Sequence, residues 1–292
     1  MNREYSIIIV SFNDGKLIEN SVKPALQSNA SRIIISAGGK NTDIQFINEI
    51  KDQRLIFLKE DERLGKARAI NRCLPYAKGD LLFILGGDLK YSADVFQNCI
   101  TLFSQKTGVV APRVQPEGGS GLAGVIGRLM WRFHHAELGY MAMHGRNSHG
   151  GEFLAFRREI VDQIPDVIND DAYICLQARR KGMNVVYAPE IQVRNYLPLN
   201  LHQLISQRVR VNYGHIQLSK LGLDPGVMDS LLFSNFRDFL RIIWKQIRDK
   251  PEDAFILPLA MMIELISIAI ARRRYERGMD YSIWPILERG YV

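Results

Sequence analysis

The chain has 292 residues, of which 47% are hydrophobic, so it is long enough for one substantial α/β domain with a smaller appendage, and its composition argues against disorder. Its 38 basic and 31 acidic residues give a formal charge of +7, which favours an anionic partner such as a nucleotide, a phospholipid surface or a nucleic acid. The three cysteines, Cys73, Cys99 and Cys175, are far apart and lack CxxC spacing. This argues against a disulfide framework or a zinc site and fits a reducing cytoplasm.

The first half of the chain alternates short β-branched runs with polar stretches of helical pattern. The alternation predicts βαβ units and a mainly parallel sheet with helices on both faces. The apolar run at the N-terminus is too brief for a secretory signal, so we expect this end to lie inside the fold. The expected strands are SIIIVSF, RIIIS, RLIFLK and DLLFIL. Helices are expected between them, the first near residues 15–29.

The middle of the chain is rich in glycine over residues 108–127, where we expect a strand followed by a mobile loop. A strand, a helix and another strand are expected in GGEFLAFRREIV, NDDAYICLQARRKG and MNVVYAPEIQV. Between these regions lie four histidines whose spacing does not match a helical zinc site. We expect that loop to contribute to an acceptor pocket and not to a metal site; its histidines are His134, His135, His144 and His149.

The last part of the chain, residues 221–292, predicts two helices. The stretch over residues 255–271 is strongly apolar, but it contains Pro258 and Glu264 and is shorter than the roughly 20 residues that a membrane-spanning helix needs. We therefore expect an amphipathic extension that lies in a membrane interface; the alternative is packing on the preceding domain. The first helix separates its apolar from its basic residues, namely Leu232, Phe236, Phe239, Leu240, Ile243 and Ile247 from Arg237, Arg241, Lys245 and Arg248.

Four segments in order resemble the family 2 glycosyltransferases of the GT-A fold. The resemblance covers about residues 5–220 and implies a GT-A catalytic domain over residues 1–220, with a Rossmann-like, mostly parallel sheet flanked by helices. It further implies inverting transfer of a sugar from a nucleotide diphosphate donor to an acceptor hydroxyl. The segments are SFNDG at 11–15, RLGKARAINRCLPYAKGDLLFILGGD at 63–88, NDDAYICLQARRKGMNVVYAPE at 169–190 and QRVRV at 207–211.

The strand that ends in GGD carries the expected metal site. A departing diphosphate is commonly neutralised by a hard divalent cation with oxygen ligands. Asp88 matches the second Asp of the family's Asp-x-Asp motif, whereas Gly86 replaces the first. Two alternatives follow: Asp88 binds Mg²⁺ or Mn²⁺ with the donor phosphates, or basic residues take over that role. Gly86 and Gly87 permit close approach of the diphosphate.

Further residues are expected around the donor. The resemblance places Ser11 and Asn13 near the nucleotide, and it makes Lys66 and Arg68 candidates for its phosphates. Ser36 stands where the family often has an acidic residue at the base or ribose. The choice between UDP and GDP therefore stays open.

The QRVRV segment resembles the family's Gln-x-x-Arg-Trp signature. Gln207 and Arg210 match it, and Val211 replaces the tryptophan that is associated with holding a growing polymer. A processive polymerase is therefore disfavoured. Arg208 and Arg210 are expected to grip the diphosphate of the donor or the acceptor.

Asp170 and Asp171 are the catalytic candidates. An acceptor hydroxyl must lose a proton as it attacks, so a carboxylate is needed as the general base. The two residues open a predicted helix whose N-terminal dipole favours the ionised form, and the resemblance matches Asp171 to the family's base. The alternative is that the two carboxylates only cap the helix, with Asn169 beside them.

The sequence as a whole therefore predicts a transferase that uses a nucleotide sugar and acts on a lipid or lipid-linked acceptor at an anionic membrane surface. Its expected place is the cytoplasmic side of the membrane, as a peripheral or monotopic protein. One alternative is a soluble transferase for a polysaccharide or small molecule, and another is a non-catalytic nucleotide-sugar-binding protein. Nucleic acid is not expected as a partner, because the basic residues lie on amphipathic helices and not in a groove with stacking aromatics.

Overall fold

The computed structural model describes the chain except residues 1–2, 146–149, 225–235 and 280–292. Leu232 and His149, which the sequence analysis named, lie outside the described residues. By packing, the chain divides into two compact units, and each is described by itself. The first comprises Met1–Gln115 and His149–Asn195, and the second comprises Pro116–Ser148 and Tyr196–Val292.

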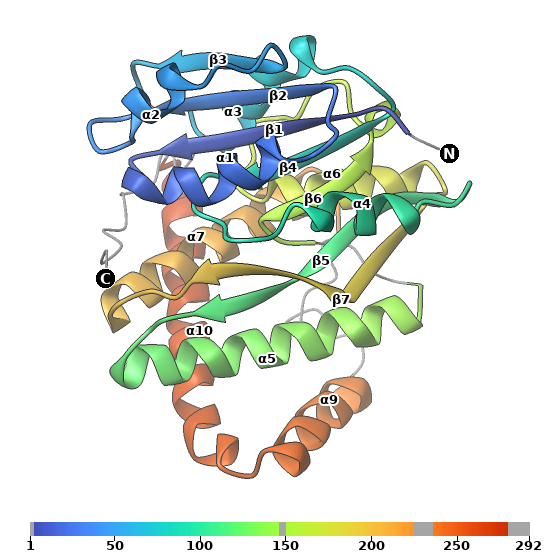
Figure 1. Cartoon of the computed structure of the whole chain (residues 1–292). Coiled ribbons are helices and arrows are strands. Elements are labelled where there is room, and N and C mark those ends of the chain that lie inside the picture. The colour runs from blue at the N-terminus through green and yellow to red at the C-terminus, as the bar shows by residue number, and fades with distance from the viewer. Residues whose placement is uncertain (1–2, 146–149, 225–235, 280–292) are drawn as a thin grey trace. The chain divides into compact units, whose positions relative to one another are not determined.

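A seven-stranded sheet with the order β3-β2-β1-β4-β6-β5-β7 forms the centre of the first unit (Figure 1). The strands β1 to β4 pair in parallel, whereas β6 runs antiparallel to both β4 and β5. The strands are β1 (Tyr5–Phe12), β2 (Arg32–Gly38), β3 (Leu55–Glu60), β4 (Leu81–Gly86), β5 (Thr107–Glu117), β6 (Phe153–Arg157) and β7 (Asn184–Tyr196).

Helices cover both faces of this sheet, as the alternating pattern predicted (Figure 1). Nearly every residue of β1 and β4 is buried, which suits central strands that are covered on both sides. On one face, Phe96 packs edge-on against Phe83 with ring centroids 5.1 Å apart. The helices of this unit are α1 (Ile18–Leu26), α2 (Ile44–Glu49), α3 (Lys66–Cys73), α4 (Asp94–Thr101) and α6 (Asp170–Arg180), with short 3-10 turns at Gly15–Leu17, Leu74–Tyr76 and Arg158–Ile160.

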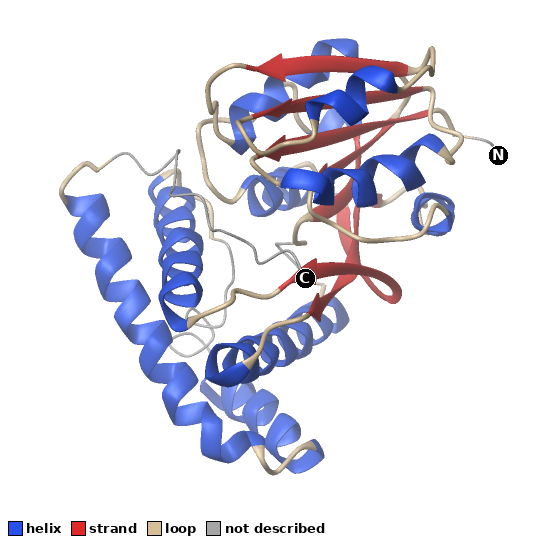
Figure 2. Ribbon diagram, turned by 60° about the vertical axis from the view of Figure 1, so that its left-hand side comes forward, coloured by secondary structure: helices blue, strands red, loops and turns tan. Residues whose placement is uncertain are grey.

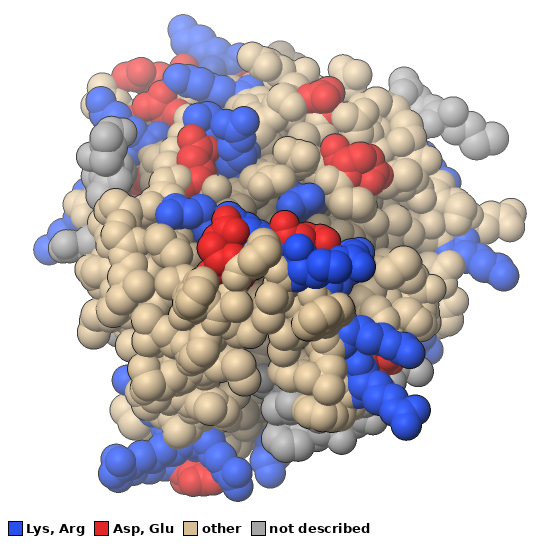
Figure 3. Space-filling model, turned by 90° about the horizontal axis from the view of Figure 1, so that it is seen from below, with Lys and Arg blue, Asp and Glu red and all other residues tan. Residues whose placement is uncertain are grey.

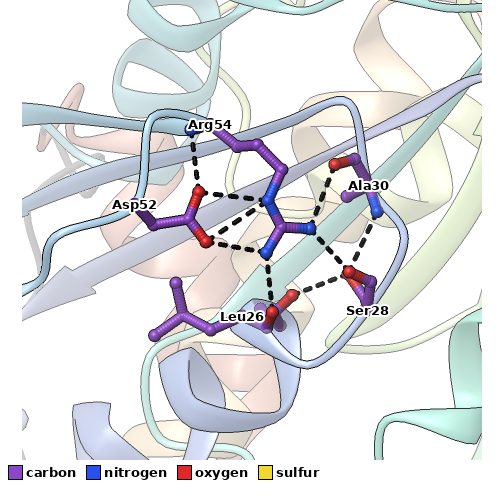
Figure 4. A network of polar contacts seen from close by, with 6 residues as sticks. Leu26, Ser28, Ala30, Asp52 and Arg54 are labelled. Carbon is purple, nitrogen blue, oxygen red and sulfur yellow. Dashed lines mark hydrogen bonds and ion pairs between the residues drawn. The ribbon is translucent and has the colours of Figure 1, made fainter.

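A guanidinium network fastens the loop between α1 and β2 (Figure 4). Arg54 donates to Asp52 from Nε and Nη2, at 3.1 and 2.7 Å. It also donates to the carbonyl oxygens of Leu26 at 2.7 Å and Ser28 at 2.6 Å. The ion pair holds the pKa of Asp52 below its usual value, mainly through the hydrogen bond from Arg54. This network fixes the amino end of the sheet, opposite the edge that carries the candidate site.

The second unit contains a group of helices that share an apolar core. They are α5 (Gly121–Met143), α7 (Leu201–Lys220), α9 (Phe236–Asp249) and α10 (Asp253–Glu276). Figure 2 shows α10 as a long helix of this group. The core includes Ile126, Leu129 and Phe133 from α5, Leu204 from α7, and residues of α9 and α10, namely Phe239, Ile242, Ala260 and Ile263.

A strand followed by a mobile loop was expected over residues 108–127. The strand is present as β5, but the expectation of a loop is wrong from Gly121 onward, where α5 begins. The same helix contains His134 and His135, which were expected to lie on a loop. Apolar residues at helical spacing bury one side of α5, and that burial outweighs the low helix propensity of its glycines.

The compact units do not divide the chain at residue 220, because α5 and α7 pack with α9 and α10. The expected functional boundary, with a catalytic domain over 1–220 and an extension over 221–292, stays a prediction. The three cysteines are free and buried.

Candidate active site

The carboxyl ends of β1, β2 and β4 bring three loops to one edge of the sheet. Val10 pairs with Gly86 on one side, and Ser11 pairs with Ala37 on the other. The strand order reverses between β1 and β4, since β2 and β3 lie on one side of β1 and β4 lies on the other. Ligands of open α/β sheets bind beyond the carboxyl ends at such a point, so this edge is the candidate site.

The turn after β4 holds Asp88 in a fixed position. The amide of Gly87 donates to the carbonyl of Val10 at 2.8 Å, and the hydroxyl of Ser21 donates to the carbonyl of Gly86 at 2.9 Å. Asp88 is 6% exposed. A Cβ atom at position 86 would lie 2.7 Å from Oδ1 of Asp88. The glycine at this position therefore makes room for the Asp88 carboxylate.

Ser11 and Asp14 close over the same turn. The Ser11 hydroxyl donates to Oδ2 of Asp14 at 2.8 Å. A Cβ atom at Gly87 would lie 2.5 Å from the Ser11 hydroxyl and 3.1 Å from Asp14 Oδ2. The sequence analysis missed Asp14, although it lies inside the SFNDG segment, because only its neighbours matched a family role.

Asn13 ties the β1 loop to the β2 loop. It has a positive φ of 65°, which asparagine tolerates better than most residues. Its amide donates to Thr42 Oγ1 at 2.9 Å, and its side-chain oxygen accepts from the amide of Asn41 at 3.2 Å. Asn13 therefore shapes the edge at which a nucleotide was expected.

Ser36 is fully buried, and its hydroxyl donates to Glu60 Oε1 at 2.6 Å. Glu60 ends β3 and is 5% exposed. Burial raises the pKa of Glu60 above its usual value, and the hydrogen bond from Ser36 opposes that rise. An acidic residue thus stands beside Ser36 from the next strand, which sequence reasoning missed because β3 and β2 are brought together only by pairing.

The side chains at this edge decide whether a divalent cation fits there. Among the residues that the structure describes, no group of three or more His, Cys, Asp or Glu side chains has the arrangement of a metal site. The turn does, however, present the carboxylate of Asp88 in the space that a side chain at Gly86 would fill, with Ser11 and Asp14 close to Gly87. Mg²⁺ is commonly bound through one or two carboxylates together with substrate phosphates and water, and this edge fits that mode.

Asp170 and Asp171 are the first two residues of α6, which belongs to the first unit. Asn169 occupies the N-cap position, but its side chain makes no capping bond. Asp171 is half-buried, and its Oδ2 accepts from the amide of Gly151 at 2.7 Å. Gly151 has a φ of 117°, a conformation that only glycine adopts readily. A carboxylate held by a backbone amide yet still accessible has the properties required of a general base.

The two cationic candidates of α3 are both paired. Lys66 Nζ lies 3.0 Å from Asp170 Oδ2. Arg68 forms an ion pair with Asp166 at the protein surface. The structure thus brings Lys66 to the catalytic candidates, whereas the guanidinium of Arg68 is directed to another carboxylate. A phosphate role for either residue stays a prediction.

Gln207, Arg208 and Arg210 lie on α7, in the second unit. Arg208 makes a bidentate pair with Glu264 of α10, with N–O distances of 2.7 and 2.8 Å. Asn212 donates to the same carboxylate at 2.9 Å. Burial raises the pKa of Glu264, but the charge and hydrogen bonds of Arg208, the hydrogen bond from Asn212 and the charge of His215 together outweigh it and leave the pKa below its usual value. Arg208 thus holds α10 on α7, a role that sequence reasoning did not foresee.

The fold is that of a GT-A glycosyltransferase. Residues 2–214 match the family described as Glycosyltransferase like family 2, and the chain belongs to that family. It is therefore a transferase enzyme, and the expected fold class, a mostly parallel sheet flanked by helices, is confirmed.

Curated relatives match a large part of the chain. It is 23% identical over 222 residues to the poly-beta-1,6-N-acetyl-D-glucosamine synthase of Staphylococcus aureus, a match that covers 70% of this chain and 53% of the relative. The bifunctional protein GlmU of Francisella philomiragia is 27% identical over 122 residues, which are 41% of this chain and 27% of that protein. The chain thus spans about half the length of the synthase.

Solved structures share the fold. The mannosyltransferase PcManGT of Pyrobaculum calidifontis, in complex with GDP-Man and Mn²⁺, superposes with a TM-score of 0.61 at 17% identity, covering 97% of this chain and 78% of that one. The glucosyl-3-phosphoglycerate synthase of Mycobacterium tuberculosis, in complex with Mn²⁺, UDP and phosphoglyceric acid, superposes with a TM-score of 0.54 at 17% identity, covering 76% and 80%.

Proposed function

We propose that this protein transfers a sugar from a UDP- or GDP-linked donor to an acceptor hydroxyl or phosphate, with inversion at the anomeric carbon. The observation that carries the proposal is Asp171, an accessible carboxylate held by the amide of Gly151 at 2.7 Å. For a hydroxyl acceptor, Asp171 removes the proton as the oxygen attacks the anomeric carbon, and the nucleoside diphosphate leaves. The solved structures named above, with GDP-Man or UDP bound, support a donor of this class.

A divalent cation, Mg²⁺ or Mn²⁺, is proposed as the cofactor, with Asp88 as its protein ligand. The cation would neutralise charge on the departing diphosphate. Asp88 sits just beyond the carboxyl end of β4, and the absence of side chains at Gly86 and Gly87 lets the Asp88 carboxylate and the Ser11 hydroxyl lie close to this turn. Ser11 and Asp14 adjoin the turn and are proposed to orient the donor.

A lipid or lipid-linked acceptor at an anionic membrane surface is proposed from the second unit. By length and composition α10 is able to cross a membrane, and it is longer than the apolar run suggested from the sequence. Its polar interruption, Glu264, is paired with Arg208 and so does not oppose contact with lipid. Exposed apolar side chains remain on α9 and α10, among them Phe236, Leu240, Trp244, Phe255, Met262 and Leu265.

We propose that these helices lie in the interface on the cytoplasmic side of a membrane, as a peripheral or monotopic attachment. Figure 3 shows a face with broad stretches of uncharged surface and separate groups of Lys and Arg side chains. Apolar surface with basic residues nearby suits anionic lipid headgroups. The three consecutive arginines Arg272, Arg273 and Arg274 follow the apolar part of α10.

A second candidate acceptor is a growing polysaccharide, which the likeness to the Staphylococcus aureus synthase favours. A lipid acceptor and a polysaccharide acceptor make the same demand on Asp171, so the test of catalysis applies to both.

The assignment of Asp171 is tested by Asp171→Asn. We expect donor turnover to fall by about 10²–10⁴-fold, because the amide cannot accept the proton, while the Kd of UDP or GDP stays within about twofold. Nucleotide release measures turnover, and isothermal titration measures nucleotide binding. The matched control is Asp162→Asn, an exposed carboxylate before the same helix, which should leave both unchanged. Turnover within threefold of the wild type in Asp171→Asn would overturn the assignment.

A further inference from the structure

Lys66 points its charge into the protein and away from solvent. It is the first residue of α3, and Gly65 before it has a φ of 85°, which turns the chain into the helix. Its Nζ lies 3.0 Å from Oδ2 of Asp170, and the two side chains are 21% and 4% exposed. A lysine that binds a phosphate from solvent is expected to be exposed and available. Lys66 is instead paired with a buried carboxylate.

Three carboxylates surround this ammonium group. Burial alone would lower the pKa of Lys66, but the charges of Asp170, Asp171 and Glu152 outweigh it and leave the pKa above its usual value. Burial raises the pKa of Asp170 and Asp171 adds to that rise, whereas Lys66 opposes it. Burial also raises the thiol pKa of Cys175, which interacts with the charges of Asp171 and Asp170. Lys66 is therefore a cation on which the charges of all three carboxylates act.

Asp171, the candidate base, and the preceding Asp170 are held by different groups. Gly151 donates its amide to Asp171 at 2.7 Å, and Gly150 approaches the same oxygen at 3.4 Å. On the other side Asp170, the preceding residue, is anchored by Lys66. Removal of one partner from a buried ion pair leaves an uncompensated charge and is strongly unfavourable. The start of α6 is thus held by an ion pair to Asp170 and by the backbone amides of Gly151 and Gly150 at Asp171.

We propose that Lys66 is a positioning residue of the transfer reaction: it anchors Asp170 at the start of α6 and places its positive charge beside the carboxylates there, so that Asp171 is held where it can accept the acceptor's proton. This inference rests on the proposed function. The sequence analysis made Lys66 a candidate for binding the donor phosphates, whereas the proposal assigns it to activation of the acceptor. Asp170 likewise becomes the partner of Lys66 and not a second base.

The test compares Lys66→Met with Lys66→Arg, which keeps the charge. In Lys66→Met we expect kcat to fall at least tenfold and the acid limb of the pH profile of kcat to move about one unit to higher pH, because the carboxylates lose their cation. The Kd of UDP or GDP should stay within twofold, and Lys66→Arg should recover most of kcat. A tenfold weaker Kd together with an unmoved acid limb would show that Lys66 binds the donor phosphates and would overturn the proposal.

A second measurement does not depend on turnover. In urea unfolding, Lys66→Met and Asp170→Asn should each lower the midpoint, and the double variant should lower it by less than the sum of the two. Additive losses would mean that the pair is not coupled and would overturn the anchoring role. If the wild-type protein turns over no donor while the two losses are not additive, the proposed function fails and the ion pair stands.

Discussion

Single residues at the sheet edge determine where its carboxylates lie. A Cβ atom at position 86 would lie 2.7 Å from Asp88 Oδ1, so Gly86 and the position of Asp88 depend on each other. The departure from the Asp-x-Asp motif is therefore a local structural change and not only the loss of a ligand. Asp14, joined to Ser11 at 2.8 Å, brings a carboxylate from the β1 loop to the space beside Gly87.

Glu60 gives a pH-dependent prediction at this scale. Burial raises its pKa in the folded chain, so the folded state binds the proton more tightly than the unfolded state. The contribution of Glu60 to the free energy of unfolding is then greatest at acid pH and is lost as the pH rises through the folded pKa. Glu60→Gln removes the ionisable group, so the free energy of unfolding no longer falls with the ionisation of this side chain. We expect it to gain stability relative to the wild type between pH 4 and pH 7, by about 1.4 kcal/mol for each unit of the raised pKa.

Urea unfolding at several pH values measures this difference. Glu62→Gln changes an exposed carboxyl two residues away and is the matched control, for which we expect parallel curves. Parallel curves for Glu60→Gln and the wild type would show that Glu60 is not perturbed by burial.

The sequence predicted the places of Asp88 and Asp171 because each follows from a local pattern, an apolar strand that ends in glycines and a helix that begins with two carboxylates. It did not predict their partners. Lys66 and Asp170 are more than 100 positions apart, and Ser36 meets Glu60 across two strands. Such pairs follow from tertiary packing, which residue types and spacing do not encode.

At the scale of elements, the strands of the first unit could be predicted and α5 could not. Four β-branched runs gave the parallel strands because strand periodicity is local. The glycine-rich start of α5 indicated a loop, yet Ile126 and Leu129 pack into the core of the second unit. Tertiary burial overrides propensity there. In α9, the predicted apolar face is divided between the buried Phe239 and the exposed Leu240.

The exposed apolar side chains of α10 give a prediction about membranes. Phe255 is 86% exposed and Leu265 is 64% exposed. If α10 lies on a lipid surface, burial of each side chain contributes about 1.5–3 kcal/mol. We therefore expect the double variant Phe255→Ser with Leu265→Ser to bind anionic phosphatidylglycerol vesicles at least tenfold more weakly than the wild type, as measured by flotation.

Tyr76→Ser is the matched control for this experiment, since Tyr76 is an exposed aromatic residue of the first unit, 45% exposed. It should bind vesicles as the wild type does. The membrane proposal is wrong if the wild-type chain does not float with anionic vesicles, or if the double variant floats equally well.

At the scale of the whole molecule, the chain combines a sheet unit with a helical unit. The sheet unit carries Asp88, Asp170 and Asp171. The helical unit is joined internally by partly buried ion pairs, in which Arg132 binds Asp253 and Arg208 binds Glu264. Three of the four segments that resemble the family lie in the first unit, and the fourth, QRVRV, lies on α7 in the second. The composition of the second unit follows from packing of α5 and α7 with α9 and α10, and α5 is distant from the other three in sequence.

Sugar transfer with a cation at Asp88 can be measured as nucleotide release from a panel of UDP- and GDP-sugars, with a membrane lipid extract as the acceptor source, in Mn²⁺ and again in EDTA. We expect release from one donor, greater with the extract, lost in EDTA and greatly weakened in Asp88→Asn. Release that persists in EDTA would contradict the metal at Asp88. Failure of every donor to react in Mn²⁺ with the extract present would contradict sugar transfer itself.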